Sequence, residues 1–425
     1  MTSNTHRILV VLLLGFTLAA ADVAAESIVT SRTFRGETVQ SEREEQQALF
    51  DYYFRDGDLR YETKFANLET AATVPAWRIP YATPIYPEQS GGLANARSSA
   101  GTVLAKYDLA FNDGQLLADS YDRRRKQGTV VRRGLFGRTR TQTTNTAESW
   151  EGYCSGFAAS TIRHPEPMLP VDAGAVGGRP GVVFQPSEIK ALLLAAYNRT
   201  RPDSFLLVAP PSASNGGPNM GTFHLALANY IGQAGHPIAI DRTRGRVNWN
   251  NPIYHYEVTS IRDAGRQGDY HYKDLTTRIT YTAYANRQMI QTNRETGERQ
   301  GQPSQSMVIR YRLTLDSDGH IVGGRALSHA GHFLWIPLYA VQGIRDQTSP
   351  GNPHLDVEKV IALARKSALP EIREKYDQVV IGKLTDPQIA IRAEAERLRE
   401  IEAQEVAARE VAAQQAVEDI NGDED

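Results

Sequence analysis

Cys154 is the only cysteine among the 425 residues, and it lies in the segment ESWEGYCSGFAAS, Glu148–Ser160. A chain with one cysteine forms no internal disulfide, so its thiol is either buried as a small hydrophobic group or used in chemistry. The small residues that follow predict a helix beginning at or just before Cys154. A thiol at a helix N-terminus meets free N–H groups and the positive end of the helix dipole, which lower its pKa and can bind an oxyanion. This pattern favours a nucleophile for acyl transfer, with a structural cysteine as the alternative.

A nucleophilic cysteine needs a base, and the base needs a group that orients it. The best candidate base is His224, a polar residue inside the apolar stretch FHLALANYI. Thr222 is expected to cap a helix there, and Pro237–Asp241 is expected to form a strand that ends in a carboxylate. Such a strand would return beside the helix and present Asp241 to the imidazole of His224. His255, in IYHYEV, is the competing base.

The elements around these residues indicate an α+β fold, with helices early and an antiparallel sheet later. Gln185–Asn198 has one apolar face and predicts a helix capped by Ser187. Three runs between Ile253 and Leu315, IYHYEVTSI, TTRITYTAY and SMVIRYRLTL, alternate as strands do, and Asp316–Gly319 predicts a hairpin turn. That turn lacks the downstream glutamate of an EF-hand, so calcium is not expected. Two further segments predict a helix, Ser41–Phe54, and a basic hairpin, Lys126–Arg140.

Composition divides the chain into four parts. Residues 1–25 have the order of a cleavable signal peptide: a polar head, a short apolar run and then small residues. Residues 26–75 are polar, 76–380 form the expected catalytic domain, and 381–425 are rich in Ala, Glu and Arg. This last part predicts a long helix that is solvated or available to bind a partner. We therefore expect a secreted or periplasmic protein with no membrane span in the mature chain.

The charge balance excludes some partners. With 47 basic and 49 acidic residues, the formal net charge is −2, which indicates neither nucleic acid nor an acidic membrane as a partner.

Four stretches together resemble the transglutaminase elicitor family of oomycetes and its bacterial relatives. They are WEGYCSGFAAS, FHLALANYIG, AIDRT and VNWNNPIYHYEV, in that order. The last is the most specific: it matches the Trp-Asn-x-Pro-hydrophobic-x-x-aromatic-x-Val core of the peptide through which plants sense the oomycete enzyme. The resemblance spans roughly Trp77 to Pro337. It implies a core distantly related to papain-like cysteine proteases.

The resemblance also implies roles for particular residues. Cys154 would be the nucleophile, His224 the base and Asp241 the group that orients it. Papain-like enzymes carry an oxyanion-donating glutamine six positions before the cysteine, but here that position is Glu148, so the second oxyanion donor is unassigned. The indole of Trp150 could donate or simply pack.

The activity that the resemblance implies is protein-glutamine gamma-glutamyl transfer. The thiolate attacks a glutamine side-chain carboxamide, ammonia leaves, and a lysine amine or water resolves the thioester; this chemistry needs no cofactor. Trp150 and Trp249 could wall the cleft, with Asn250 and His255 close by. A cysteine protease would use the same residues on a backbone amide, and an inactive binding or adhesive module is the third reading.

Overall fold

The computed structural model describes residues 37–378 with internal gaps. The gaps are 55–58, 100, 126, 134–138, 149–150, 199–203, 212–216, 245–246, 286–302 and 339–351. The predicted signal peptide, the predicted C-terminal helix and Trp150 lie outside the described residues. No helix within the described part of the chain is long and apolar enough to cross a membrane.

A large antiparallel sheet forms the centre of the molecule. Its strands follow the order β13-β12-β11-β10-β9-β14-β8, and β1 pairs with β10 beside this path. The strands are β1 (Ala71–Thr73), β8 (Phe205–Ala209), β9 (Ile238–Asp241), β10 (Asn250–Gln267), β11 (Tyr270–Thr282), β12 (Ser304–Leu315), β13 (Ile321–Ala326) and β14 (Phe333–Pro337). The three predicted strands and the strand ending at Asp241 are therefore confirmed.

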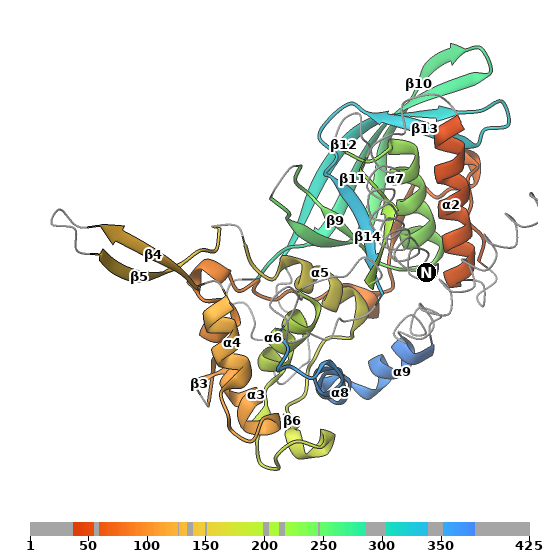
Figure 1. Cartoon of the computed structure of the whole chain (residues 1–425). Coiled ribbons are helices and arrows are strands. Elements are labelled where there is room, and N and C mark those ends of the chain that lie inside the picture. The colour runs from red at the N-terminus through yellow and green to blue at the C-terminus, as the bar shows by residue number, and fades with distance from the viewer. Residues whose placement is uncertain are drawn as a thin grey trace, which may run out of the picture.

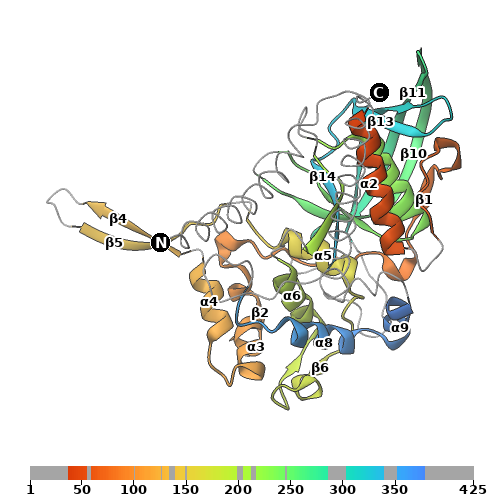
Figure 2. The same ribbon diagram turned by 45° about the vertical axis from the view of Figure 1, so that its right-hand side comes forward.

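Two groups of helices lie on opposite sides of this sheet (Figures 1 and 2). On one face lie α2 (Glu37–Phe54) and α7 (Met220–Ala226), which a π-helical segment, Leu227–Gln233, continues. On the other side, α5 (Cys154–Arg163) packs against β9, β10 and β14, and α6 (Pro186–Tyr197) packs against α5. Further from the sheet, α3 (Val103–Phe111) and α8 (Val357–Ser367) pack against α6, and α4 (Leu117–Arg125) packs against α3. The short α9 (Pro370–Gln378) follows α8. The mixed helical and antiparallel architecture agrees with the predicted α+β class.

Short strand pairs lie outside the main sheet. β4 (Gln127–Arg133) and β5 (Thr139–Asn145) form the predicted basic hairpin, which projects from the body of the molecule (Figure 1). The other two pairs are β2 (Arg97–Ser98) with β3 (Gly101–Thr102), and β6 (Val171–Asp172) with β7 (Val183–Phe184).

Alternation along the central strands separates two hydrophobic cores. In β9, Ile238 and Ile240 pack in the first core, with α2 and α7, whereas Ala239 between them packs in the second core, with α3, α5, α6 and α8. In β14, Leu334 and Ile336 likewise belong to the first core and Trp335 to the second. Successive strand residues point to opposite faces, so Asp241, two residues beyond Ala239, faces the second core and α5.

Two helix caps differ from the predicted ones. The N-cap of α6 is Gln185, which forms a reciprocal capping box with Glu188, so Ser187 lies inside the helix. α7 begins three residues earlier than predicted, and its N-cap is Asn219, whose side chain accepts from the backbone N–H of Gly221. In both cases the helix itself was predicted correctly, and a neighbouring side chain supplies the cap.

Candidate active site

Cys154 is the first residue of α5, as predicted. Its Sγ donates to the backbone carbonyl of Asn248 at 3.3 Å, and its side chain is buried, with 8% of the residue exposed. Helix α5 lies close against α6 because residue 156 is glycine: a Cβ there would stand 2.2 Å from the carbonyl oxygen of Leu194. The glycine at position 156 thus lets α5 pack closely against α6.

Hydrogen-bond donors converge on the sulfur from two elements. The Nδ2 of Asn250, at the start of β10, lies 3.8 Å from Sγ. The backbone N–H groups of Asn250 and Ser155 also interact with the sulfur. Donors arranged in this way can stabilise a thiolate or a developing oxyanion.

Trp335 sets the orientation of the Asn250 amide. The indole Nε1–H of Trp335 donates to Oδ1 of Asn250 at 2.9 Å. An indole only donates, so the oxygen of the amide must face Trp335 and the NH2 group must face the sulfur. Tyr284 donates to the backbone carbonyl of Asn250 at 2.9 Å and fixes the same residue from the other side. The sequence analysis did not predict a role for Trp335 or Tyr284, because an aromatic residue in or beside a strand usually indicates a core position.

Burial dominates the electrostatics of the thiol. It raises the pKa of Cys154 above its ordinary value, and the nearby Asp241 carboxylate adds to the rise, while the N–H groups of Asn250 and Ser155 oppose it. The predicted lowering of this pKa by the helix N-terminus is therefore wrong for the resting state, because the loss of solvent outweighs the donors.

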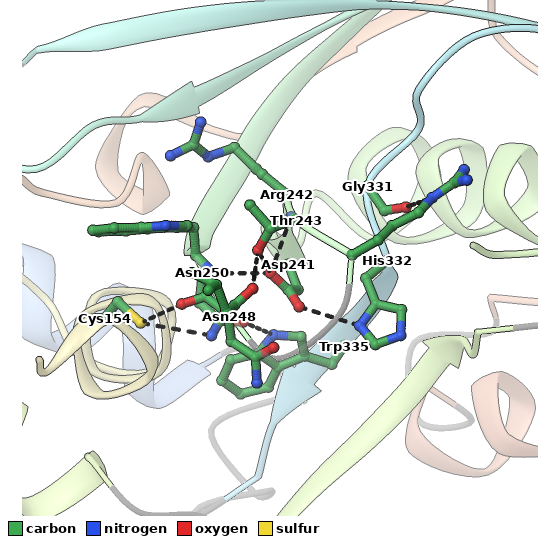
Figure 3. Close-up of polar contacts among 12 residues, drawn as sticks. Cys154, Asp241, Arg242, Thr243, Asn248, Asn250, Gly331, His332 and Trp335 are labelled. Atoms are coloured by element: carbon green, nitrogen blue, oxygen red, sulfur yellow. Dashed lines mark hydrogen bonds and ion pairs between the residues drawn. The ribbon is translucent and has the colours of Figure 1, made fainter. Parts of the chain in front are cut away.

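Asp241 lies on the same face of the sheet as the thiol and is fully buried. Its Oδ1 accepts from the backbone N–H groups of Trp249 and Thr243 at 2.9 and 3.2 Å, and from the Thr243 hydroxyl at 3.0 Å. Its Oδ2 lies 3.3 Å from Nδ1 of His332. In Figure 3 the carboxylate stands between Cys154 and His332.

Gly331 allows His332 to approach this carboxylate closely. Residue 331 has φ +78°, and a Cβ there would meet the carbonyl oxygen of Asp241 at 2.7 Å. The backbone N–H of His332 donates to that same carbonyl at 2.8 Å. The His332 side chain keeps 24% of its surface exposed, so it links the buried carboxylate to solvent.

His224 does not join this arrangement, which corrects the predicted His224–Asp241 pair. The helix that carries it, α7, packs against β8, β12, β13 and α2, whereas α5 packs against β9, β10, β14 and α6. The His224 Nδ1 lies 2.7 Å from the Tyr311 hydroxyl, and its ring stacks on Phe65. Burial lowers the pKa of His224 to about 4, so it is neutral at pH 7.

The remaining predicted residues take separate positions. His255 lies on β10 with its Nδ1 2.7 Å from the Thr73 hydroxyl, and no described contact joins it to the thiol. Glu148 is exposed. Trp249 lies 5.8 Å from Tyr284 between ring centroids, and both line a pocket of about 400 Å³.

The described residues contain no group of three or more His, Cys, Asp or Glu side chains that could hold a metal ion. In the turn before β13, the Oδ1 of Asp316 accepts hydrogen bonds from the backbone N–H groups of Asp318 and His320.

Two comparisons with known proteins found a match. Residues 212–366 match the model of the transglutaminase elicitor family. They include His224, Asp241, Asn250, His332 and Trp335, while Cys154 precedes them.

The fold extends the likeness to most of the chain. The structure is similar to the crystal structure of the GP42 transglutaminase from Phytophthora sojae, with a TM-score of 0.55 and 18% sequence identity. The match covers 75% of this chain and 97% of that one. At this identity the likeness concerns the fold. No curated protein matches the chain.

Proposed function

We propose that this protein is an exported protein-glutamine gamma-glutamyltransferase that works through a thioester on Cys154. The observation that carries the proposal is the convergence of donors on a cysteine at a helix N-terminus, with a buried carboxylate–histidine pair beside it. The elicitor-family match and the fold of GP42 support transfer as the reaction. Placement of the nucleophile at the start of a helix packed on an antiparallel sheet supports the distant relation to papain-like proteases.

The first step is acylation of the sulfur. The Cys154 thiolate attacks the carboxamide carbon of a protein glutamine, and the oxyanion that forms is held by the amide of Asn250 and the N–H of Ser155. The C–N bond then breaks, ammonia leaves with the proton that the thiol gave up, and a thioester remains. The second step is attack by a lysine amine, which gives an isopeptide bond, or by water, which gives glutamate.

The Asp241–His332 pair holds and returns the proton in this proposal. The carboxylate of Asp241 stands between the thiol and His332 (Figure 3), so in this proposal the proton passes from the thiol to the carboxylate and on to Nδ1 of His332, whose partly exposed ring exchanges it with solvent. Catalytic hydrogen bonds are often long before substrate binds.

The test is incubation of the purified protein with casein and a fluorescent primary amine. Cys154-dependent incorporation supports transfer, whereas casein fragments without incorporation support a protease. Cys154→Ala should abolish labelling and leave the melting curve nearly unchanged, since the side chain is small and the sulfur makes only weak contacts, one as donor and one as acceptor.

A second candidate is a binding module without turnover. The raised pKa of Cys154 favours it, because a protonated thiol is a poor nucleophile. This candidate predicts that no glutamine-mimicking electrophile reacts with Cys154 faster than with an ordinary buried thiol.

A further inference from the structure

A pocket beside the thiol contains an arginine that forms no ion pair with any carboxylate among the described residues. It has a volume of about 400 Å³ and is lined by Arg242, Trp249, Asn251, Ala283, Tyr284 and Gln305. We call it the Arg242 pocket. It lies beside Cys154 because Trp249 separates Asn248 and Asn250, which both contact the sulfur, and because Tyr284 interacts electrostatically with the thiol. Its size is in the range of pockets that hold a ligand or a substrate side chain.

The guanidinium of Arg242 is held by neutral groups. Its Nε donates to Oδ1 of Asn251 at 2.7 Å and its Nη1 to the hydroxyl of Tyr281 at 3.2 Å, while the guanidinium lies 5.0 Å from the centre of the Tyr281 ring. Across the described part of the chain, no carboxylate forms an ion pair with Arg242. The adjacent Asp241 is directed to His332 and to the N–H groups of Trp249 and Thr243.

These contacts orient the guanidinium, but none of them supplies a negative charge. The guanidinium is already positioned by two hydrogen bonds and by the Tyr281 ring. The binding of a carboxylate therefore loses little additional conformational entropy. The rings of Trp249 and Tyr284 line the same pocket. Phe157 packs edge-on against Tyr284, with 5.2 Å between the ring centroids, and this contact holds the Tyr284 ring in place. Aromatic walls suit the aliphatic stem of a side chain, and the guanidinium suits its carboxylate.

We propose that the Arg242 pocket binds an acidic side chain of the protein substrate, close in sequence to the glutamine that reacts with Cys154. The inference rests on the proposed function for its meaning in catalysis, but the binding itself can be measured without turnover. It assigns the substrate class as glutamines with an aspartate or glutamate nearby.

Binding is measured by calorimetry with the full chain carrying Cys154→Ser, so that no reaction occurs. The probes are peptides with one glutamine in which each flanking position in turn holds Asp, Asn or Lys. At one position or more, the Asp peptide should bind about tenfold more tightly than the Asn peptide, the size expected for one partly exposed charge-assisted contact, and the Lys peptide should bind most weakly. The preference should shrink as salt is added.

Substitutions then assign the preference to one side chain. Arg242→Gln should bring the Asp-to-Asn ratio close to one, and Arg242→Glu should reverse it in favour of Lys. The matched control is Arg278→Gln, which removes an exposed arginine of β11 that pairs with Glu257, and it should keep the ratio. Thermal melts show whether each variant folds; if Arg242→Gln does not, Arg242→Met keeps the stem against Tyr281 and tests the same point.

The outcomes separate this inference from the proposed function. Equal dissociation constants for Asp, Asn and Lys peptides at every position overturn the inference, as does an equal loss of preference in Arg278→Gln. If the wild-type chain labels glutamine peptides without preference, transfer stands and the inference fails. If the peptides bind with the expected preference but wild-type chain labels none, the inference stands and transfer fails.

Discussion

His224 and Asp241 both lie fully inside the molecule, 17 positions apart, yet the two faces of one sheet give them opposite surroundings. On the first face, His224 meets aromatic rings and the Tyr311 hydroxyl, and burial makes it neutral. On the second face, Asp241 meets backbone N–H groups, a hydroxyl and His332, which together compensate a charge. The difference shows that two buried polar residues from one segment can have opposite surroundings: His224 packs in a hydrophobic core, whereas Asp241 lies on the side of the sheet that holds the thiol.

The alternation of side chains along β9 places Asp241 on the second face of the sheet. Asp241 shares its direction with Ala239, which packs in the second core, whereas Ile238 and Ile240 point to the first core, where α7 lies. An imidazole on α7 therefore faces the side of β9 that is opposite to the Asp241 side chain. The comparison predicts that substitutions on the second face affect chemistry and substitutions on the first face affect stability.

The largest expected effect comes from the Asp241–His332 pair. Asp241→Asn should lower kcat about a thousandfold, because the imidazole loses the charge that orients and stabilises it. His332→Gln should cost a similar factor, and the double variant little more than either alone, since the two residues act as one unit. Amine incorporation into casein measures all three; additive losses would show that the residues act separately.

Asn250 should follow in size. Asn250→Ala removes the side-chain donor beside the sulfur and should lower kcat by about a hundredfold with little change in KM, as for a lost oxyanion-hole donor. Trp335→Phe removes only the indole that holds the amide oxygen and should cost about tenfold. A change in KM alone, with kcat intact, would argue that these residues bind substrate and do not stabilise the oxyanion.

The pH dependence of thiol alkylation tests the electrostatics of the second face. Because burial raises the folded pKa of Cys154, its reaction with iodoacetamide should have a midpoint above that of the same thiol in the unfolded chain. The stability linked to this group is present below the unfolded pKa and is lost as pH rises through the folded pKa. A midpoint below the unfolded value would show that the helix N-terminus and Asn250 outweigh burial.

His224 should show the smallest effect on catalysis. His224→Gln should change kcat/KM by less than about threefold, while altering acid stability. The folded pKa of about 4 lies below the ordinary 6.5, so this histidine contributes stability above pH 6.5 that is lost as pH falls towards 4. The contribution is roughly 3 kcal/mol. Unfolding titrations at pH 7 and 4.5 measure it; a large loss of activity without a stability change would restore His224 to the site.

The sequence was informative wherever a pattern was local. The alternation in β10, β11 and β12, the helix that begins at Cys154 and the turn at Asp316–Gly319 all follow from neighbouring residues, and the structure confirms them. Cap positions shifted by a few residues because Gln185 and Asn219 could serve as well as the predicted Ser187 and Thr222.

The candidate site depends on contacts between distant segments, which no local pattern encodes. His332 follows Asp241 by 91 positions, and Trp335 follows Asn250 by 85. The order Cys, His, Asp was compatible with a triad containing His224, but only the face of β9 on which each side chain lies excludes that pairing. Asn250 belongs to the motif VNWNNPIYHYEV, which the sequence analysis singled out. Its position beside the sulfur, however, depends on Trp335, which orients the amide.

The central claim, that Cys154 is an acyl-transfer nucleophile activated by its second-face neighbours, is tested most directly by intact-mass measurement with a peptide bearing an electrophilic glutamine analogue. The account predicts one adduct on Cys154 at neutral pH. It should form much faster than alkylation by iodoacetamide and slow sharply in Asp241→Asn and Asn250→Ala, but not in His224→Gln. An absent adduct, or one whose rate is unchanged by the Asp241 and Asn250 substitutions, would contradict it.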